Sequence, residues 1–481
     1  MSKSNFDANL IVIGAGSGGL VSAYIAAAVK AKVILIEQHK MGGDCLNTGC
    51  VPSKSLIASA KFVHNLTRSK KYGIESASAQ FDFATVMERV RSVVDHIAPH
   101  DSIERYTSLG VEVITGQAEL LSRTQVRVND QVLNAKNIII AAGARPFVPP
   151  IEGLKEINYL TSDNVWELKS LPKRLVVLGG GPIGCELAQC FARFGSEVSI
   201  VEMLPRIMIR EDDEISENIA ETMSKEGVNV LTSHKALKVL QDAERKVLVC
   251  ENDGTTVDIE FDEILVAVGR APRLDGFGLE NLDIPTTKRR TIETNDYLQA
   301  GYSNVYAVGD IVGPYQFTHA ASHQAWYATV NALFSPFKKF KVDYSVMPWA
   351  TYTDPEVARV GLNERDAKEQ GIAYEVTTYD LAELDRAIAD GHDRGMIKVL
   401  TPPGKDKILG VTIVGAHAGD LIAEFVLAMR HGLGLNKILG TIHSYPTWME
   451  ANKFVAGNWK KKNAPAWALD LLEKYHQFRR R

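Results

Sequence analysis

This chain of 481 residues has little excess charge, few cysteines, and no low-complexity segment or long linker. Its 54 Lys and Arg residues and 58 Asp and Glu residues leave a net charge of −4, which argues against nucleic acid as a main partner. Five cysteines in such a length, with no signal sequence before Ile11, predict a cytoplasmic protein in a reducing compartment. The hydrophobic content of 45% suffices for three or four ordinary domains.

Two of the cysteines, Cys45 and Cys50, stand five positions apart in the glycine-rich segment 42–54. Two cysteines at this spacing can reach disulfide distance, and so short a ring is strained and reducible, which favours a redox-active disulfide. The alternatives are two packed cysteines or half of a zinc site. Zinc would need two more ligands at short spacing, and none follow, so we expect no metal site. Pro52 suits the first turn of a helix, whose positive end would stabilise a thiolate on Cys50 and leave Cys45 farther out.

A strand, a glycine turn and a helix are predicted twice, around residues 14–19 and 179–184, and an acid ends the next strand in each copy, Glu37 and Glu202. The glycines allow a tight turn against a pyrophosphate at a helix N-terminus, and the acid accepts hydrogen bonds from an adenosine ribose. Two dinucleotide-binding folds are therefore predicted. The uncharged stretch from Ile11 to Val29 belongs to the first copy, so we expect no membrane span there. The fingerprint glycines are Gly14, Gly16 and Gly19, and then Gly179, Gly181 and Gly184.

The remaining three cysteines are not expected to be reactive. Cys185 and Cys190 repeat the spacing of the first pair, but they lie on the helix predicted after the second glycine turn, where residues five apart point about 140° away from each other. They cannot form a disulfide there. Cys250 lies in an alternating apolar pattern that predicts strand packing.

In this order along the chain, the first glycine turn, the Cys-x4-Cys segment and the second glycine turn resemble the flavin-dependent pyridine nucleotide-disulfide oxidoreductases. The resemblance covers nearly the whole chain and implies FAD in the first fold and a nicotinamide nucleotide in the second. Further segments resemble the two crossings between the nucleotide domains, a second FAD motif whose Asp binds the ribityl chain, and a turn near the pyrimidine edge of the flavin. These segments contain Gly143 (141–146), Gly269 (268–272), Asp310 (307–310) and Ala320 (318–320).

The resemblance implies an α/β fold, with two Rossmann-like dinucleotide-binding domains and a C-terminal α+β dimerisation domain that opens near residues 353–361. It also implies a homodimer. The expected order is the first part of the FAD-binding domain, the NAD(P)-binding domain, a return segment of the FAD-binding domain and the interface domain. These are residues 1–150, 151–272, 273–345 and 346–481.

Two charged positions refine the expected cofactor sites. Lys54 follows Cys50 by one helical turn, so its amine can lie beside the flavin, and the family pairs this lysine with a glutamate that matches Glu186. The alternative is an ordinary surface lysine. Glu202 would bond a ribose 2′-hydroxyl and repel a 2′-phosphate, which predicts NAD(H) over NADP(H), although Arg206 and Arg210 could reach a phosphate.

Segment 442–450 departs from the pattern of the family's dithiol and disulfide enzymes. Those enzymes carry a His before this Pro-Thr, with a Glu five residues after the His, and use the pair as acid and base for the interchange thiol. Tyr445 stands at the position of that His, whereas Glu450 keeps its offset; a phenol that titrates at about 10 is a poor acceptor of a thiol proton. His443 matches a different family position. Mercuric reductases resemble this chain here, since they carry a Tyr, but their terminal cysteine pair is missing.

We therefore predict a flavoprotein in which electrons pass from the nicotinamide to the flavin, to the Cys45–Cys50 disulfide and to a small-molecule acceptor. Cys50 would face the flavin, Cys45 would be the interchange thiol, and the partner subunit's Tyr445 and the partner subunit's Glu450 would complete the acceptor site. The first candidate is a dihydrolipoamide dehydrogenase-like oxidoreductase. The second is mercuric-reductase-like reduction of a thiophilic metal ion or a quinone. The third is a non-enzymatic redox sensor.

The C-terminal tail combines three lysines, Lys460, Lys461 and Lys462, with apolar residues at helical spacing. We expect a helix that packs on the interface domain, and contact with an anionic surface is the alternative. The apolar residues are Trp467, Leu471, Leu472, Tyr475 and Phe478.

Overall fold

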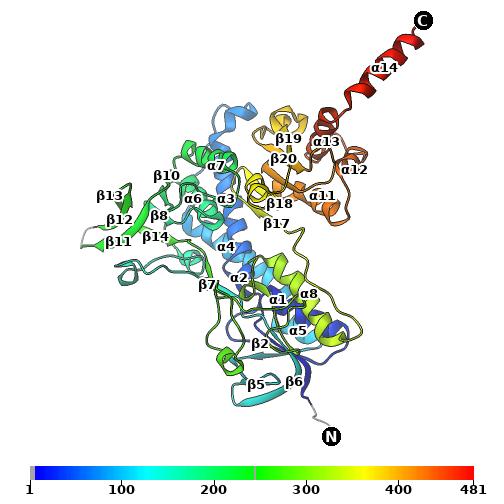
Figure 1. Ribbon diagram of the computed structural model, residues 1–481. Coiled ribbons are helices and arrows are strands. Elements are labelled where there is room, and N and C mark those ends of the chain that lie inside the picture. The colour runs from blue at the N-terminus through cyan, green and yellow to red at the C-terminus, as the bar shows by residue number, and fades with distance from the viewer. Residues whose placement is uncertain (1–5, 243–244) are drawn as a thin grey trace. The chain divides into compact units, whose positions relative to one another are not determined.

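The computed structural model describes residues 6–242 and 245–481, which form two compact units (Figure 1). The first unit comprises the described residues within 6–64, 79–207 and 226–343. The second unit comprises residues 65–78, 208–225 and 344–481. Within the described residues, no helix is long and apolar enough to cross a membrane.

The first unit contains a seven-stranded sheet in the order β3-β2-β1-β6-β5-β4, with β16 also paired to β6. The strands β3, β2, β1, β6 and β16 are parallel, and β4 and β5 add an antiparallel edge. Its central strands are apolar on both faces, because helices pack on one face and the β4–β5 layer on the other. The strands are β1 (Ala8–Ile13), β2 (Val33–Glu37), β3 (Val111–Thr115), β4 (Ala118–Ser122), β5 (Gln125–Val128), β6 (Gln131–Ile140) and β16 (Val305–Ala307).

Six helices of the chain accompany this sheet in sequence. α1 follows β1 and packs with α8 on one face, while α2 and α3 follow β2 directly and carry the two closely spaced cysteines. α4 begins after Asp82, whose side chain accepts hydrogen bonds from the first amides of the helix. The helices are α1 (Ser17–Ala28), α2 (Gly43–Asn47), α3 (Cys50–Thr67), α4 (Phe83–Ile97), α5 (Ile103–Ser108) and α8 (Thr318–Phe334).

The same unit contains a second parallel sheet in the order β10-β9-β8-β14. Its first strand along the chain is β8, which is followed by a glycine turn and then by α6. An antiparallel sheet, β11-β12-β13, packs with it through a shared apolar core. The short ribbon of β7 and β15 pairs the two segments that cross between the nucleotide folds. The elements are β7 (Ala144–Pro146), β8 (Arg174–Leu178), α6 (Pro182–Phe194), β9 (Glu197–Val201), β10 (Asn229–Leu231), β11 (Lys235–Gln241), β12 (Lys246–Asn252), β13 (Thr255–Phe261), β14 (Glu263–Val266) and β15 (Arg270–Pro272).

The second unit is built on an antiparallel five-stranded sheet in the order β17-β18-β21-β20-β19. Helices α11, α12 and α13 pack against its apolar residues in one core, and α7 joins this unit with residues 208–225. The elements are α7 (Asp213–Lys225), β17 (Pro348–Thr351), β18 (Glu356–Gly361), α9 (Glu364–Glu369), β19 (Glu375–Asp380), α10 (Asp385–Ala389), β20 (Met396–Thr401), β21 (Gly410–Gly415), α11 (Ala418–Arg430), α12 (Leu435–Leu439), α13 (Glu450–Lys462) and α14 (Ala466–Arg479).

The terminal helix α14 forms as its sequence predicts, but none of its residues is buried. In Figure 1 it extends from the end of α13 without a neighbouring element of its unit. The expectation that it packs on the interface domain is therefore wrong within this chain. An amphipathic pattern identifies an apolar face, but it does not identify what covers that face.

Candidate active site

The two cysteines five positions apart lie on successive helices. Cys45 is inside α2, and Cys50 is the first residue of α3. Both are free thiols, and Cys50 is exposed whereas Cys45 is half-buried. Cys45 stands within α2 beside the buried Leu46, while Cys50 opens its helix.

The surroundings of Cys50 lower the pKa of its thiol to about 6. The largest contribution is a hydrogen bond with the Cys45 thiol; the Thr318 hydroxyl, 3.6 Å from Cys50 Sγ, and the Lys54 ammonium add to it. Together they outweigh the partial desolvation of the Cys50 sulfur by the surrounding protein, which acts in the opposite direction. The hydrogen bond and burial raise the pKa of Cys45. Near neutral pH, Cys50 is therefore a thiolate and Cys45 keeps its proton.

Lys54 and Glu186 form an ion pair between α3 and α6, with Lys54 Nζ 2.9 Å from Glu186 Oε2. The Glu186 side chain is 7% exposed and that of Lys54 is 36% exposed. The pair spares both the buried carboxylate and the ammonium from being enclosed alone. The structure thus brings together the two residues that were predicted to flank the flavin.

The first glycine turn, between β1 and α1, has no room for a side chain at Gly14 or Gly19. A Cβ on Gly19 would lie 1.7 Å from the carbonyl oxygen of Gly14, whose own φ is +98°. Glu37 ends β2 and lies against this turn, where its carboxylate accepts hydrogen bonds from the N–H groups of Ala15 (2.7 Å) and His39 (2.8 Å).

The second glycine turn, between β8 and α6, repeats this construction. A Cβ on Gly184 would lie 2.0 Å from the carbonyl oxygen of Gly179, whose φ is +110°. Glu202 follows β9, and its carboxylate accepts hydrogen bonds from the N–H groups of Gly180 (2.7 Å) and Leu204 (2.8 Å). The crowded glycine pair, the backbone donor and the acid therefore take equivalent positions in the two turns.

Neither helix after these turns has a side-chain cap, since the N-cap residues are Gly16 and Gly181. The first amides of α1 and α6 can therefore serve an anion such as a pyrophosphate. With the acid beside each turn, the donor and acceptor sets fit two dinucleotides. Gly143 and Gly269 flank the β7–β15 ribbon, where both have a positive φ.

Asp310 lies in a short 3-10 turn, Gly309–Ile311, before α8. Burial raises the pKa of its carboxyl group to about 6, and Arg270 opposes that shift from 3.7 Å. Arg270 also hydrogen-bonds Asp44, the neighbour of Cys45. A largely buried carboxyl group of this kind suits a hydroxyl-rich ligand such as the ribityl chain of FAD. Ala320 is buried near the start of α8.

The two predicted acceptor-site residues, Tyr445 and Glu450, belong to the second unit. Tyr445 is 71% exposed, and its hydroxyl donates a hydrogen bond to Asp385 Oδ2 at 3.0 Å, which raises the pKa of the phenol. Glu450 is buried at the start of α13 and accepts a hydrogen bond from the Thr447 N–H at 3.3 Å. The Tyr445 phenol is therefore protonated at neutral pH.

His443 is held by contacts of its own. Its Nε2 lies 2.9 Å from Glu424 Oε1, its Nδ1 lies 3.1 Å from the Thr441 carbonyl oxygen, and the side chain is 4% exposed. Asn452 donates a hydrogen bond to the other Glu424 oxygen at 2.9 Å. With both ring nitrogens engaged, His443 is a structural residue of the α11–α13 region and does not offer a ready base.

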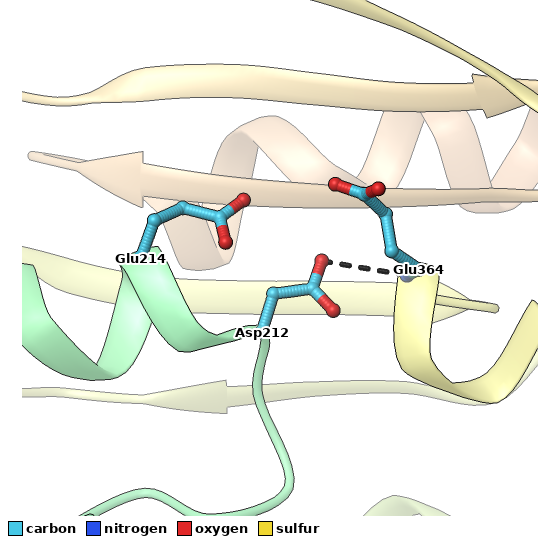
Figure 2. Close-up of side chains that lie close together, drawn as sticks. All are labelled: Asp212, Glu214 and Glu364. Carbon is cyan, nitrogen blue, oxygen red and sulfur yellow. Dashed lines mark hydrogen bonds between the residues drawn. The ribbon is translucent and has the colours of Figure 1, made fainter. Parts of the chain in front are cut away.

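One acidic cluster of the second unit has the ligand types of a metal site. Figure 2 shows Asp212, Glu214 and Glu364, whose carboxylates lie close together; Asp212 directly precedes α7, Glu214 lies in α7 and Glu364 opens α9. The Lys398 ammonium, 2% exposed, pairs with all three and is 2.8 Å from Asp212 and 2.5 Å from Glu364. Burial lowers the pKa of Lys398, but these hydrogen bonds outweigh it and raise it overall. A lysine thus fills the position of a cation.

The cysteines of the second fold are unlike Cys45 and Cys50. Cys185 and Cys190 are both buried free thiols on α6, and Cys185 donates a hydrogen bond to the Gly180 carbonyl at 3.3 Å. Burial raises the pKa of both thiols, that of Cys190 to about 12. Cys250 is buried on β12, between β11 and β13, where strand packing was predicted.

Four site residues were not predicted. Thr318 and Arg270 stand inside segments that were recognised for their glycine or alanine, and their polar side chains were the available signal. Asp44 precedes the first cysteine and had no distinctive signal of its own. Asp385, the partner of Tyr445, is 60 residues away from it along the chain, and no local pattern marks it.

Two protein-family models match the chain. The model described as pyridine nucleotide-disulphide oxidoreductase matches residues 8–325, and that of the dimerisation domain of the same family matches residues 347–455. A mercuric reductase of Lysinibacillus sphaericus is 35% identical over 457 residues, which cover 95% of this chain and 83% of that protein. A dihydrolipoyl dehydrogenase of Chlamydia pneumoniae is 34% identical over 445 residues, which cover 92% of this chain and 94% of that protein.

Solved structures show the same relationship. The Cu(II) complex of the HOCl-induced flavoprotein disulfide reductase RclA from Escherichia coli is 27% identical to this chain and superposes with a TM-score of 0.84. The match covers 94% of this chain and 99% of that structure.

Proposed function

Because this chain belongs to the pyridine nucleotide-disulphide oxidoreductase family, we propose that it takes electrons from NADH and passes them through FAD to Cys45 and Cys50 and then to a thiophilic metal ion. The predicted family and the α/β fold class are confirmed, and the family is FAD-dependent and of homodimeric type. The choice of NADH, the site residues and the acceptor are the proposal.

FAD, when bound, supplies two-electron exchange between a nicotinamide and a disulfide. The first glycine turn, Glu37 and Asp310 would hold it, with Gly143 and Ala320 beside it. The second glycine turn and Glu202 would hold the nicotinamide nucleotide, with Gly269 at the crossing. Two backbone N–H groups hold the Glu202 carboxylate in place beside the turn. A carboxylate at this position would repel a 2′-phosphate, which supports NADH over NADPH as the electron donor.

A single observation carries the redox proposal: Cys50 opens α3 with the Thr318 hydroxyl 3.6 Å from its sulfur, and together with Cys45 and Lys54 this hydroxyl lowers the pKa of its thiol to about 6. We assign Cys50 as the thiol next to the flavin and Cys45 as the interchange thiol. When the two sulfurs join, one S–S bond forms and two electrons leave. One proton leaves as well, from Cys45, because Cys50 is already ionised.

The need to remove the proton from the Cys45 thiol limits which electron acceptors this site can reduce. A dithiol or disulfide acceptor needs a base for the interchange thiol, and the Tyr445 phenol, held by Asp385, is not a base at neutral pH. A thiophilic metal ion needs no such base, because metal coordination deprotonates a thiol directly. Two electrons from the thiols reduce one divalent ion to the element, or two divalent ions to the monovalent state, as the disulfide forms.

The names of two relatives support this acceptor: one is a mercuric reductase, and the RclA structure is a Cu(II) complex. Dihydrolipoamide oxidation is the second candidate, because the dihydrolipoyl dehydrogenases match nearly their full length and Glu450 keeps its offset here. We place the activity in the cytoplasm, where a reducing environment suits the two thiols.

The test is NADH oxidation by the FAD-loaded dimer at pH 7 with four acceptors: Hg(II) or Cu(II) as a small-thiol complex, lipoamide, glutathione disulfide and a soluble quinone. The Cys45→Ser/Cys50→Ser variant measures the electron flow that bypasses the thiols. We expect metal turnover well above lipoamide turnover, and we expect the double variant to lose it.

Lipoamide turnover above metal turnover, with an optimum near neutral pH, would contradict the proposed acceptor and make this chain a dihydrolipoamide dehydrogenase. Failure of NADH to reduce the flavin would overturn the whole electron path. That failure is the result expected of a sensor that signals through its disulfide alone.

A further inference from the structure

The terminal helix α14 presents its apolar residues to solvent. Trp467 is 72% exposed and Phe478 is 75% exposed, and four further large apolar side chains on α14 are about half exposed or more. Within α14 no residue is buried. An exposed apolar stretch of this size indicates a surface that another partner covers. The four are Leu469, Leu471, Leu472 and Tyr475.

Most of these residues fall on one face of the helix. Trp467, Leu471, Tyr475 and Phe478 follow the spacing of four, four and three residues that keeps side chains on a single stripe. The acids Asp470 and Glu473 and the polar Gln477 lie on the opposite side. α14 is therefore amphipathic, with aromatic rings at both ends of its apolar stripe.

Positively charged residues lie on both sides of this apolar stripe along the chain. Residues 460–481 contain seven Lys and Arg and two acids, a net charge of +5 in a chain whose total is −4. Three lysines end α13 just before the helix, and Arg479, Arg480 and Arg481 close it. An apolar stripe flanked by basic groups is the pattern of a helix that lies in the interface of an anionic bilayer.

The helix α14 lies outside the segment that the family's dimerisation model matches. The dimerisation model matches residues 347–455, and α14 begins at Ala466 beyond that match. Nucleic acid would suit the basic groups but would leave the aromatic and leucine side chains in water. A lipid surface takes both groups at once.

We propose that α14 lies flat on an anionic phospholipid bilayer, with its apolar stripe at the boundary between headgroups and acyl chains and its basic ends among the headgroups. Its 14 residues extend about 21 Å, short of the roughly 30 Å hydrocarbon core, so the helix rests on the surface and does not cross it. The attachment is peripheral, and the rest of the enzyme stays in the aqueous phase beside the membrane. This inference is independent of the electron acceptor.

The test is flotation of the FAD-loaded full chain with vesicles of phosphatidylglycerol and phosphatidylcholine, and with vesicles of phosphatidylcholine alone. We expect binding to the anionic vesicles at least tenfold stronger, and we expect high salt to weaken it. Trp467→Ser/Phe478→Ser should lose most binding to both vesicle types. Lys460→Gln/Lys461→Gln should weaken binding to the anionic vesicles by about fivefold for each charge removed. Gln477→Ser, on the polar side of α14, is the matched control and should bind as the unmodified chain does.

Each variant is compared for FAD content and NADH oxidation, which α14 should not affect. Unchanged flotation of the Trp467→Ser/Phe478→Ser variant would overturn the proposal. Absence of vesicle binding by the full chain would also overturn it. If removal of residues 466–481 then converted the dimer into a monomer, a second copy of the chain would be what covers α14. Light scattering of the full chain and the truncated chain gives the mass of each.

Discussion

The two nucleotide folds of this chain share a glycine turn and an adjacent acid, yet only one of them carries a reactive pair of cysteines. Both folds also contain two cysteines separated by four residues, Cys45 and Cys50 in one and Cys185 and Cys190 in the other. In the first fold the pair lies after the second strand, on α2 and at the start of α3. In the second fold the pair lies inside α6.

This difference in position produces opposite chemistry from one spacing. Cys50 opens a helix, meets Cys45, Thr318 and Lys54, and has its pKa lowered to about 6. The thiols on α6 are fully buried, and burial raises the pKa of Cys190 to about 12. Spacing sets whether two sulfurs can meet, whereas the local backbone and neighbouring charges set whether either is ionised.

Substitution of Cys45 or Cys50 should have the largest effect on turnover. Cys45→Ser and Cys50→Ser should lower turnover with the acceptor by a factor on the order of 10³ or more, the scale of losing a nucleophile. Cys185→Ala and Cys190→Ala should leave turnover unchanged, because neither thiol ionises. Steady-state NADH oxidation with the acceptor measures both results.

The absorption spectrum of the same variants separates the roles of the first pair. In the reduced protein a thiolate against the flavin should produce a long-wavelength band, which Cys50→Ser should abolish and Cys45→Ser should retain. The reverse pattern would exchange the roles of the two thiols. Loss of turnover in Cys185→Ala would break the comparison between the folds.

Replacement of Tyr445 by His should change the ratio of lipoamide turnover to metal turnover, because it would give the Cys45 thiol a base. A general base contributes about 10²–10⁴ in rate, so Tyr445→His should raise lipoamide turnover at pH 7 by up to about 10²-fold if the acceptor pocket fits. Metal turnover should gain little, since the metal displaces the thiol proton itself. Tyr445→Phe is the control, because it removes the hydroxyl that donates to Asp385 without adding a base. Equal gains for both variants would show that the hydroxyl only obstructed the pocket.

Alkylation of the reduced protein should titrate at Cys50 with a midpoint near pH 6, because its thiolate forms above that pH and is protonated below it. Cys45→Ala removes the largest cause of the low pKa, so the midpoint should rise towards 9, and the thiolate fraction available for labelling at pH 7 should fall by up to about a hundredfold. Lys54→Met should give a smaller rise in the same direction. Peptide mass spectrometry assigns the label, and Cys185 and Cys190 should stay unlabelled across this range. A midpoint for Cys50 that does not move in Cys45→Ala would show that the helix and Lys54 suffice.

The sequence was enough to predict the features that depend on local backbone geometry. The turns at Gly14 and Gly179 need a positive φ, and there is no space for a side chain at Gly19 or Gly184, so all four positions require glycine. The acids Glu37 and Glu202 come at a fixed distance because one strand separates them from the turn. Short-range geometry of this kind can be predicted from the order of residues in the sequence.

Contacts between distant segments were not predictable in the same way. Thr318 is 268 residues from Cys50, and Asp385 is 60 residues from Tyr445. Lys398 meets its three carboxylates only because β20, α7 and α9 assemble in one unit. Tertiary packing decides these pairings, and no periodicity in the sequence encodes them.

The smallest expected effect lies at the acids that the two folds share. Glu202→Ala should narrow the preference for NADH over NADPH by up to about fivefold, because a half-buried charge that still meets solvent contributes about 1 kcal/mol to such discrimination. The matched change Glu37→Ala should weaken retention of FAD and leave the nucleotide preference as it was, since that acid belongs to the other turn. Stopped-flow reduction of the flavin by each nucleotide measures the preference, and flavin fluorescence after dilution measures retention. Faster reduction by NADPH in the unmodified protein would refute the role of Glu202 and point to Arg206 as a phosphate ligand.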